Sequence, residues 1–461
     1  MILLKGCFHV ASFDDAGSEW KGCDILLKDG VIERIAPSIE LSAEEKVKAE
    51  VLDCSKHLVI PGMVNTHHHF YQTLTRNLPG AQNAKLFDWL VYLYPIWAKI
   101  DAEAVYQSTL LAGAELLRTG ATASTDHLYL YPRGFVGDMV ELQFEAVCRL
   151  GMRFAPTRGC MTRGKSAGGL PPDHVVQTPD EVLADMARAV ERFHDPSPLS
   201  MRRVILAPCS PFSVEASVMV ETAKLARSKG VLLHTHLVET LDEEEYTLKM
   251  HGVRPLRLME EWGWTGPDIF YAHGIHFNDE ELEVLRKTGT GVAHCPTSNM
   301  RLGSGIARVT EMLRKGIRVG LAVDGSASND SSDMLGEVRN AMLLQRVRYG
   351  ADALTARDAL RMATRGGAAL LGLERCGQIR EGYAADLALF DLSGPAYAGA
   401  LSDPVAALVF CGYDHRADVT IVNGKVVVRG GRVLGLDEEA LTARCHAISR
   451  RMMAEAATTA G

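Results

Sequence analysis

Three consecutive histidines, His67, His68 and His69, end the apolar run VIPGMVNTHHH. Side chains alternate across a strand, so His67 and His69 should point to one side and His68 to the other. Such a pair can offer two imidazole rings to one metal ion. Without further donors, the pair is better interpreted as the polar end of a strand. The metal interpretation therefore depends on ligands from other segments.

Two other segments offer such donors. The sequence HTHLVE repeats the pattern at His234 and His236, and Asp324 follows the apolar run LAV. An isolated Asp-Gly is most often a turn, but an aspartate that ends a strand opposite several histidines is better explained as a ligand. Imidazole and carboxylate without thiolate suit Zn²⁺, with Fe²⁺ as the alternative, and leave a position open for water. The cysteine-ligated deaminase signature HxE with PCxxC is absent from the sequence.

The elements around these residues predict a parallel barrel. Apolar runs alternate with helical patterns, such as those at residues 104–117, 179–193, 216–228 and 279–287. Eight strands with helices between them predict a distorted (β/α)8 TIM barrel, and the lack of GxGxxG after the first run disfavours an open doubly wound sheet. A barrel brings the ends of its strands to one mouth, where the polar residues should meet. The runs occupy residues 59–69, 121–127, 153–159, 203–210, 231–239, 268–276, 290–296 and 318–325.

Both ends of the chain predict β-structure. A hairpin pattern surrounds Lys28-Asp29-Gly30, and Asn423-Gly424 joins two β-branched runs near the other end. These patterns indicate a small β-sandwich domain assembled from both chain ends. The expected organisation is residues 1–57 and 375–434 for the small domain, 58–374 for the barrel, and 435–461 for a C-terminal helical segment.

Composition excludes several classes of protein. A net charge of -8 without a Lys/Arg block argues against a nucleic-acid-binding surface. The N-terminus MILLKGCFHV does not resemble a signal peptide, and no apolar run reaches the ~18–20 residues of a membrane span. The ten cysteines are scattered without a CxxC pair, as expected for free thiols in a reducing cytoplasm. We therefore expect a cytoplasmic protein without a nucleic-acid or membrane partner.

Several motifs together resemble the amidohydrolase superfamily, in the branch of aminohydrolases that deaminate nucleobases and s-triazines. The matching text covers nearly the whole chain. It reads PGMVNTHHH, ELLRTGATASTDH, HTHLVET, AHGIHFNDEEL, AHCPTSNMRLGSG, GLAVDGSASND, GYAADLALFD and VTIVNGKVVV.

The resemblance implies roles for individual residues. The ligands would be His67, His69, His236 and Asp324, and Asp324 would also take a proton from the attacking water. Glu239 would be the proton shuttle, and His273 would orient the water or polarise the substrate. On the alternative interpretation, Glu239 only caps the acidic stretch at residues 242–245, which we expect to be the solvated start of a helix.

One divalent metal per chain is expected, most simply Zn²⁺. Members of the superfamily with two metals carry a lysine at the end of the fourth strand, where this chain reads Ala207-Pro208-Cys209-Ser210. The absence of that lysine also disfavours a cyclic-amide hydrolase. A metal-free, inactive protein on the same fold is disfavoured by the complete set of ligands. A homo-oligomer is expected.

The segments HHHFYQTLTRNLPGAQNAKLFDWL and GKSAGGLPPDHVVQ are most similar to the 8-oxoguanine deaminases of this branch. The resemblance implies hydrolysis of 8-oxoguanine to urate and ammonia, with hydroxyatrazine-type triazines or isoxanthopterin as the alternative substrates. The loop at residues 168–172 is a candidate lid. The amide of Gln72 offers both a donor and an acceptor to a purine edge. Candidate substrate contacts are Gln72, Trp97, His127 and Tyr129, although aromatic residues at such positions often only pack.

Overall fold

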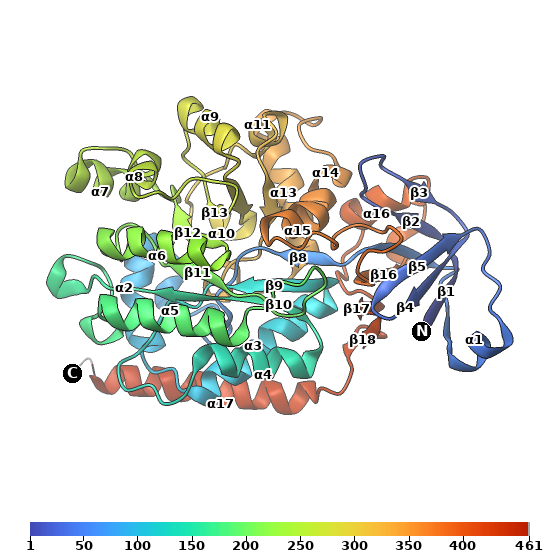
Figure 1. Ribbon diagram of the computed structural model, residues 1–461, viewed down its shortest axis with the longest axis horizontal. Coiled ribbons are helices and arrows are strands. Elements are labelled where there is room, and N and C mark those ends of the chain that lie inside the picture. Colours follow the sequence, from blue (N-terminus) through green and yellow to red (C-terminus); the bar gives the residue numbers. More distant parts are fainter. Residues whose placement is uncertain (460–461) are drawn as a thin grey trace.

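The computed structural model, which describes residues 1–459, contains a barrel and a smaller β-domain beside it (Figure 1). The predicted (β/α)8 barrel is confirmed, because eight strands lie side by side in the order of the sequence and pair in parallel. Its strands are β8 (Met63–Asn65), β9 (Ala121–Asp126), β10 (Arg153–Cys160), β11 (Ile205–Pro208), β12 (Leu233–Leu237), β13 (Ile269–His273), β14 (Gly291–His294) and β15 (Val319–Leu321).

Main-chain hydrogen bonds join the first and last strands of the barrel. The Thr66 N–H donates to the Leu321 carbonyl oxygen at 3.2 Å, and the Asp324 N–H donates to the His67 carbonyl oxygen at 3.1 Å. Strands of a parallel barrel are covered on both faces, and every residue of these eight strands except His236 is buried. The same bonds bring the residues that follow β8 against those that follow β15.

Helices cover the outside of the barrel, and local sequence signals fix where they begin (Figure 1). Capping boxes start three of them, between Thr178 and Glu181, between Asn278 and Glu281, and between Thr355 and Asp358. The helices are α2 (Leu86–Trp97), α3 (Ala102–Arg118), α4 (Met139–Leu150), α5 (Pro179–Phe193), α6 (Ala216–Lys229), α7 (Leu241–His251), α8 (Pro255–Glu261), α9 (Asp279–Thr288), α10 (Pro296–Arg301), α11 (Val309–Arg314), α12 (Ser326–Asn329), α13 (Met334–Tyr349), α14 (Ala356–Arg361) and α15 (Gly367–Leu370).

The small domain is a β-sandwich built from both ends of the chain, as predicted. One sheet has the order β5-β4-β1-β6 and the other β19-β18-β17-β16-β7-β2-β3, and apolar residues of both sheets form one core. In Figure 1 its N-terminal strands are blue and its C-terminal strands orange to red. The strands are β1 (Ile2–Cys7), β2 (His9–Ala11), β3 (Glu19–Trp20), β4 (Cys23–Lys28), β5 (Val31–Ala36), β6 (Glu50–Asp53), β7 (His57–Pro61), β16 (Leu387–Asp391), β17 (Val419–Val422), β18 (Lys425–Arg429) and β19 (Arg432–Val433), with helices α1 (Ala43–Lys48) and α16 (Pro404–Phe410).

Helix α17 (Glu438–Thr459) follows the small domain and packs against α3 and α2 of the barrel (Figure 1). Ion pairs of Arg444 with Glu103 and of Arg451 with Asp101 attach it there. Ala460 and Gly461, which belong to the expected C-terminal segment, lie outside the described residues. Within residues 1–459, no helix is both long enough and apolar enough to cross a membrane.

Candidate active site

The four candidate metal ligands meet at the mouth of the barrel. His67 and His69 directly follow β8, His236 lies in β12, and Asp324 follows β15. The Nε2 atoms of His69 and His236 are 3.2 Å apart. Asp324 Oδ1 lies 3.3 Å from His67 Nε2 and 3.4 Å from His69 Nε2. Residues separated by more than 250 positions in the sequence thus present their donor atoms to one point.

The ring nitrogens that face one another are the unprotonated ones. His69 Nδ1 lies 2.8 Å from the His127 carbonyl oxygen, and His236 Nδ1 lies 2.7 Å from the Cys209 carbonyl oxygen. A carbonyl oxygen only accepts, so both Nδ1 atoms carry the proton. The two Nε2 lone pairs therefore point toward each other, and a cation between them would turn this repulsion into ligation.

His67 is held in the same tautomer by another histidine. His234 Nδ1 donates to the Phe270 carbonyl oxygen at 2.9 Å, which leaves His234 Nε2 to accept the His67 Nδ1–H at 2.7 Å. His67 Nε2 is buried and makes no hydrogen bond. Such supporting partners are typical of metal-binding histidines, because they fix both the tautomer and the orientation of the ring.

The electrostatics of the four groups suit a divalent ion. Burial lowers the pKa of His67, His69 and His236, so that the rings are neutral and able to ligate. Burial by itself would raise the pKa of Asp324, but its close contact with His67 and the other neighbouring rings hold that pKa well below its ordinary value. Three neutral imidazoles and one carboxylate fit a divalent metal with a position left for water.

His68 points away from this site, as the alternation of side chains predicted. Its Nε2 lies 3.0 Å from Ser332 Oγ, its Nδ1 accepts the His69 N–H at 2.8 Å, and its ring contacts Phe70. The ring therefore has a packing role behind the candidate metal ligands.

We expect His68→Ala to keep a full equivalent of metal and most of the activity, because its ring contributes no donor to the site. Elemental analysis and turnover of the variant, beside His69→Ala, test this. Loss of metal from His68→Ala with retention in His69→Ala would show that the ligand assignment is shifted by one residue.

The candidate proton-transfer residues lie beside the ligands. His273 Nε2 is 3.5 Å from Glu239 Oε2 and 4.0 Å from Asp324 Oδ2, and its Nδ1 donates to Asn299 Oδ1 at 2.9 Å. Burial raises the pKa of Glu239 to about 7. A carboxyl group with such a pKa can both take up and release a proton near neutral pH. Asn299, in the motif AHCPTSN, was not identified from the sequence as the residue that orients His273.

Backbone strain accompanies these residues. His273 has a φ of 71° and Asp324 a φ of 64°, and Val238, which precedes Glu239, has a φ of 57°. Non-glycine residues rarely adopt this region, and they do so most often where the surrounding structure fixes a functional geometry. The strain turns each strand end sharply, so that the side chains face the mouth.

The acidic stretch after Glu239 differs from the expectation. Asp242 and Glu245 are exposed, as predicted for a solvated helix start, but Glu243 is buried with 1% of its surface exposed. It accepts a hydrogen bond from the Glu239 N–H at 3.1 Å. Sequence alone grouped it with its neighbours because four adjacent acids give no sign of which one turns inward.

A cleft lies directly beside the candidate ligands. Gln72 and Tyr129 line it, as predicted for substrate contacts, and the Gln72 Oε1 atom is buried without a partner. Gly325 makes room for this amide, since a Cβ there would lie 1.9 Å from Gln72 Oε1. The cleft therefore contains an unsatisfied acceptor next to the metal-binding groups.

Two other candidate substrate contacts lie outside the cleft. Trp97 is buried behind it, where its Nε1–H donates to Thr75 Oγ1 at 2.9 Å. His127 lies beneath the ligands, with its Nε2 donating to the Ala207 carbonyl oxygen at 2.8 Å and its ring stacked 4.7 Å from that of His236. Both positions give these rings supporting contacts instead of access to a substrate.

Helix α2 forms one wall of the cleft, which the sequence did not predict. The polar members of this wall are Trp89, whose Nε1–H donates to the Ala327 carbonyl oxygen at 3.3 Å, and Tyr94, whose buried hydroxyl has no hydrogen-bond partner. The candidate lid at residues 168–172 lies against the outer side of α2 and does not line the cleft. Helix α2 lies in the segment that follows the first barrel strand, and loops after barrel strands form the active sites of such barrels. This position in the sequence could therefore have predicted that α2 lines the cleft. The further lining residues are Leu86, Leu90, Cys209, Phe212, Leu302 and Ser328.

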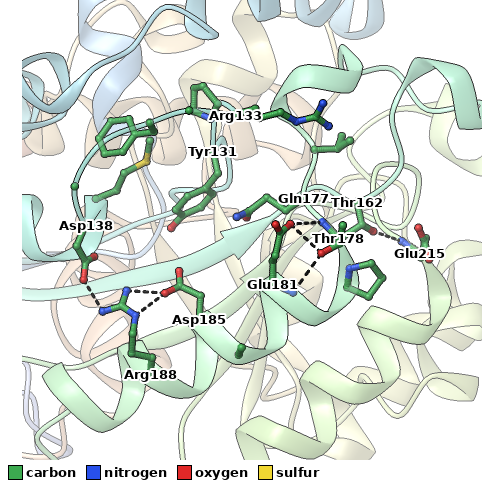
Figure 2. A pocket seen from close by; sticks show the side chains of 18 of the residues that line it. Tyr131, Arg133, Asp138, Thr162, Gln177, Thr178, Glu181, Asp185, Arg188 and Glu215 are labelled. Atoms are coloured by element: carbon green, nitrogen blue, oxygen red, sulfur yellow. Dashed lines mark hydrogen bonds and ion pairs between the residues drawn. The ribbon is translucent and has the colours of Figure 1, made fainter.

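A second, more open cavity lies between the loop after β9 and helix α5 (Figure 2). Its Arg188 bridges Asp138 and Asp185, at 2.6 Å from each. Figure 2 also shows Glu181 bound to Thr178. Because these charges are satisfied within the protein and none of the candidate ligands lines this cavity, we place the chemistry at the barrel mouth.

Comparison with known proteins identifies relatives along nearly the whole chain. The profile described as the amidohydrolase family matches residues 58–427. The chain is 47% identical over 406 residues to 8-oxoguanine deaminase of Pseudomonas aeruginosa, covering 88% of this chain and 90% of that protein. It is 39% identical over 461 residues to hydroxydechloroatrazine ethylaminohydrolase of a Pseudomonas species, covering 98% and 95%. The zinc complex of atrazine chlorohydrolase from Arthrobacter aurescens superposes with a TM-score of 0.92 at 31% identity, covering 97% and 100%.

Proposed function

The chain belongs to the amidohydrolase family, and from this premise we propose that it hydrolyses 8-oxoguanine to urate and ammonia. The observation that carries the proposal is the convergence of His67, His69, His236 and Asp324 beside a cleft that contains Glu239. The 8-oxoguanine deaminase relative supports this substrate. The reaction cleaves the exocyclic C–N bond of a cyclic amidine.

We propose that the site holds a single Zn²⁺ per chain. Its donors fit that ion, and the zinc complex of the structural relative supports the choice. The end of β11 supplies Pro208 and Cys209, not the lysine that would bridge a second ion. When bound, a zinc ion lowers the pKa of a water molecule to about 7 and so supplies a hydroxide at neutral pH.

The surrounding residues can move the protons that deamination requires. The ionised Asp324 can accept a proton from the attacking water, while His273 Nε2 orients that water toward the ring. Glu239 can deliver a proton to the ring nitrogen beside the amino-bearing carbon, which makes that carbon more electrophilic. The proton taken up by Asp324 can then pass to the amino group, so that the C–N bond breaks and ammonia leaves. As the carbonyl forms from the oxygen of the water, its remaining proton returns to Glu239.

An ammonia-release assay across purines, pterins and triazines tests this function. We expect a higher kcat/KM for 8-oxoguanine than for guanine, isoxanthopterin or hydroxyatrazine. Turnover of triazines alone would contradict the proposal. It would instead favour the function of a triazine aminohydrolase, like the hydroxydechloroatrazine ethylaminohydrolase of the Pseudomonas species. Equal use of guanine and 8-oxoguanine would contradict the substrate assignment while leaving the chemistry in place.

We expect Gln72→Ala to narrow the preference for 8-oxoguanine over guanine by about 10-fold or more while metal content stays normal. The two purines differ on the five-membered ring, where 8-oxoguanine has a carbonyl and an N–H. A site that hydrogen-bonds a substrate rejects the analogue that leaves its own polar groups unpaired, and the Gln72 amide is such a group. The effect is measured as the ratio of kcat/KM for 8-oxoguanine to kcat/KM for guanine, in the wild type and in the variant. An unchanged ratio would show that Gln72 does not distinguish the two purines.

We further propose a cytoplasmic homo-oligomer without a nucleic-acid or membrane partner. The ten cysteines are free thiols in the structure, which agrees with a reducing compartment. Light scattering of the purified protein determines the number of chains, and fractionation of expressing cells determines the location.

A further inference from the structure

Glu243 is a buried carboxyl group outside the set of residues that the proposed mechanism uses. It belongs to the first turn of α7 and has 1% of its surface exposed. One oxygen, Oε2, accepts the Glu239 N–H at 3.1 Å, and the other, Oε1, is buried without a hydrogen-bond partner. Burial raises the pKa of this group to about 8. Burying a carboxyl group is costly, so its presence here indicates a specific contact worth retaining.

The contact supports a strained turn. Val238, between β12 and Glu239, is a β-branched residue with a φ of 57°. Such a conformation is strained and persists only where neighbours enforce it. On one side, the Val238 carbonyl oxygen accepts the Ile275 N–H at 2.9 Å, which joins this turn to the one after His273. On the other side, Glu243 holds the next peptide N–H along the chain.

The geometry of the helix start explains how Glu243 reaches that N–H. Thr240 is the N-cap of α7, and its side chain makes no cap hydrogen bond. In a capping box the third helical residue accepts the N–H of the N-cap. Glu243 occupies that third position, but it accepts the N–H one residue earlier, at Glu239. The helix therefore fixes the backbone of the residue whose side chain enters the cleft.

We propose that Glu243 is a positioning residue, which holds the Glu239 carboxyl group beside His273 and the substrate through its bond to the Glu239 N–H. The role in turnover rests on the proposed function, because it assumes that Glu239 transfers protons. The positioning of Glu239 is independent of the identity of the substrate.

Two variants of nearly equal size separate this role from simple packing. Glu243→Gln keeps an oxygen that accepts the N–H, whereas Glu243→Met fills the same space without an acceptor. We expect Glu243→Met to lower kcat by about 10- to 100-fold, because small misplacements of a catalytic group have effects of this order. KM and metal content should stay within about twofold of wild type, and Glu243→Gln should keep at least about a third of kcat. Glu245→Gln, on an exposed acid of the same helix, is the control.

Crystal structures of the two variants provide a readout that needs no activity. Glu239 should move away from His273 in Glu243→Met and stay in place in Glu243→Gln. An unmoved Glu239 in Glu243→Met, wild-type kcat in that variant, or an equal fall in both variants would overturn the proposal. If Glu243→Met does not fold, a fall of kcat in folded Glu243→Gln to the level of Glu239→Gln overturns it. A wild type inactive on every heterocycle would reject the proposed function, and the crystal structures would still decide the positioning.

Discussion

Glu239→Gln should lower kcat by at least about two orders of magnitude while the protein keeps its metal and its fold. The amide preserves the shape of the side chain but cannot carry a proton, and general acid–base catalysis typically contributes about 10²- to 10⁴-fold. The position of Glu239, 3.5 Å from His273 Nε2 and inside the cleft, is the structural reason to expect the effect. Ammonia release under saturating 8-oxoguanine measures kcat, and elemental analysis measures the metal.

Three results would contradict this expectation, and each would assign Glu239 a different role. Near-normal turnover of Glu239→Gln would remove Glu239 from the reaction and make His273 the next candidate. Loss of metal from the variant would show that Glu239 supports the ligands. A fall in kcat/KM with unchanged kcat would assign it to substrate binding instead of to proton transfer.

His236→Ala should lose the metal and lower turnover by at least about 10³-fold, because water without a metal has a pKa of about 15.7 instead of about 7. The expected wild-type content is one equivalent per chain. Chelation should have the same effect on activity and should be reversed by Zn²⁺. At a free metal concentration of about 100 Kd, binding stabilises the fold by about 2.7 kcal/mol, so chelation should also lower the melting temperature.

The matched control for this experiment is His276→Ala, because the His276 Nε2 lies 2.9 Å from the Ser304 carbonyl oxygen and outside the ligand set. It should retain the metal. Two equivalents of metal in active wild type would contradict the single site. Full activity in metal-free protein would contradict the metal-dependent mechanism altogether.

Some contacts could be predicted because they follow from one local rule. Alternation along an extended chain placed His68 opposite His67 and His69, and the structure confirms that His68 bonds to Ser332 instead. This local rule does not predict which face of a helix packs against the rest of the protein. Trp97 and Trp89 lie two turns apart in α2, and only the docking of that helix decides that Trp89 lines the cleft.

The burial of individual polar side chains was the property that could be predicted least well from the sequence. Glu243 and Glu245 have the same side chain on the same helix, yet one is buried and the other exposed. The two side chains lie about 200° apart around the helix axis, so only one of them can face the interior. Which one does so depends on the orientation of α7 after the turn at Val238, whose φ is 57°. A left-handed valine has no sequence signature, because most valines in strands are extended.

The sequence by itself determined the barrel and the residues that meet at its mouth. Apolar runs predict the parallel strands, and the polar residues that follow these runs must lie together because the C-terminal ends of the strands form one mouth. It also determined the small domain, since hairpin signals recur at both ends of the chain. Tertiary structure alone decided which nitrogens face one another, that α2 lines the cleft beside the candidate ligands, and that Glu243 accepts the Glu239 N–H. These features depend on how separate elements pack, and packing is set by distances between residues that no local pattern encodes.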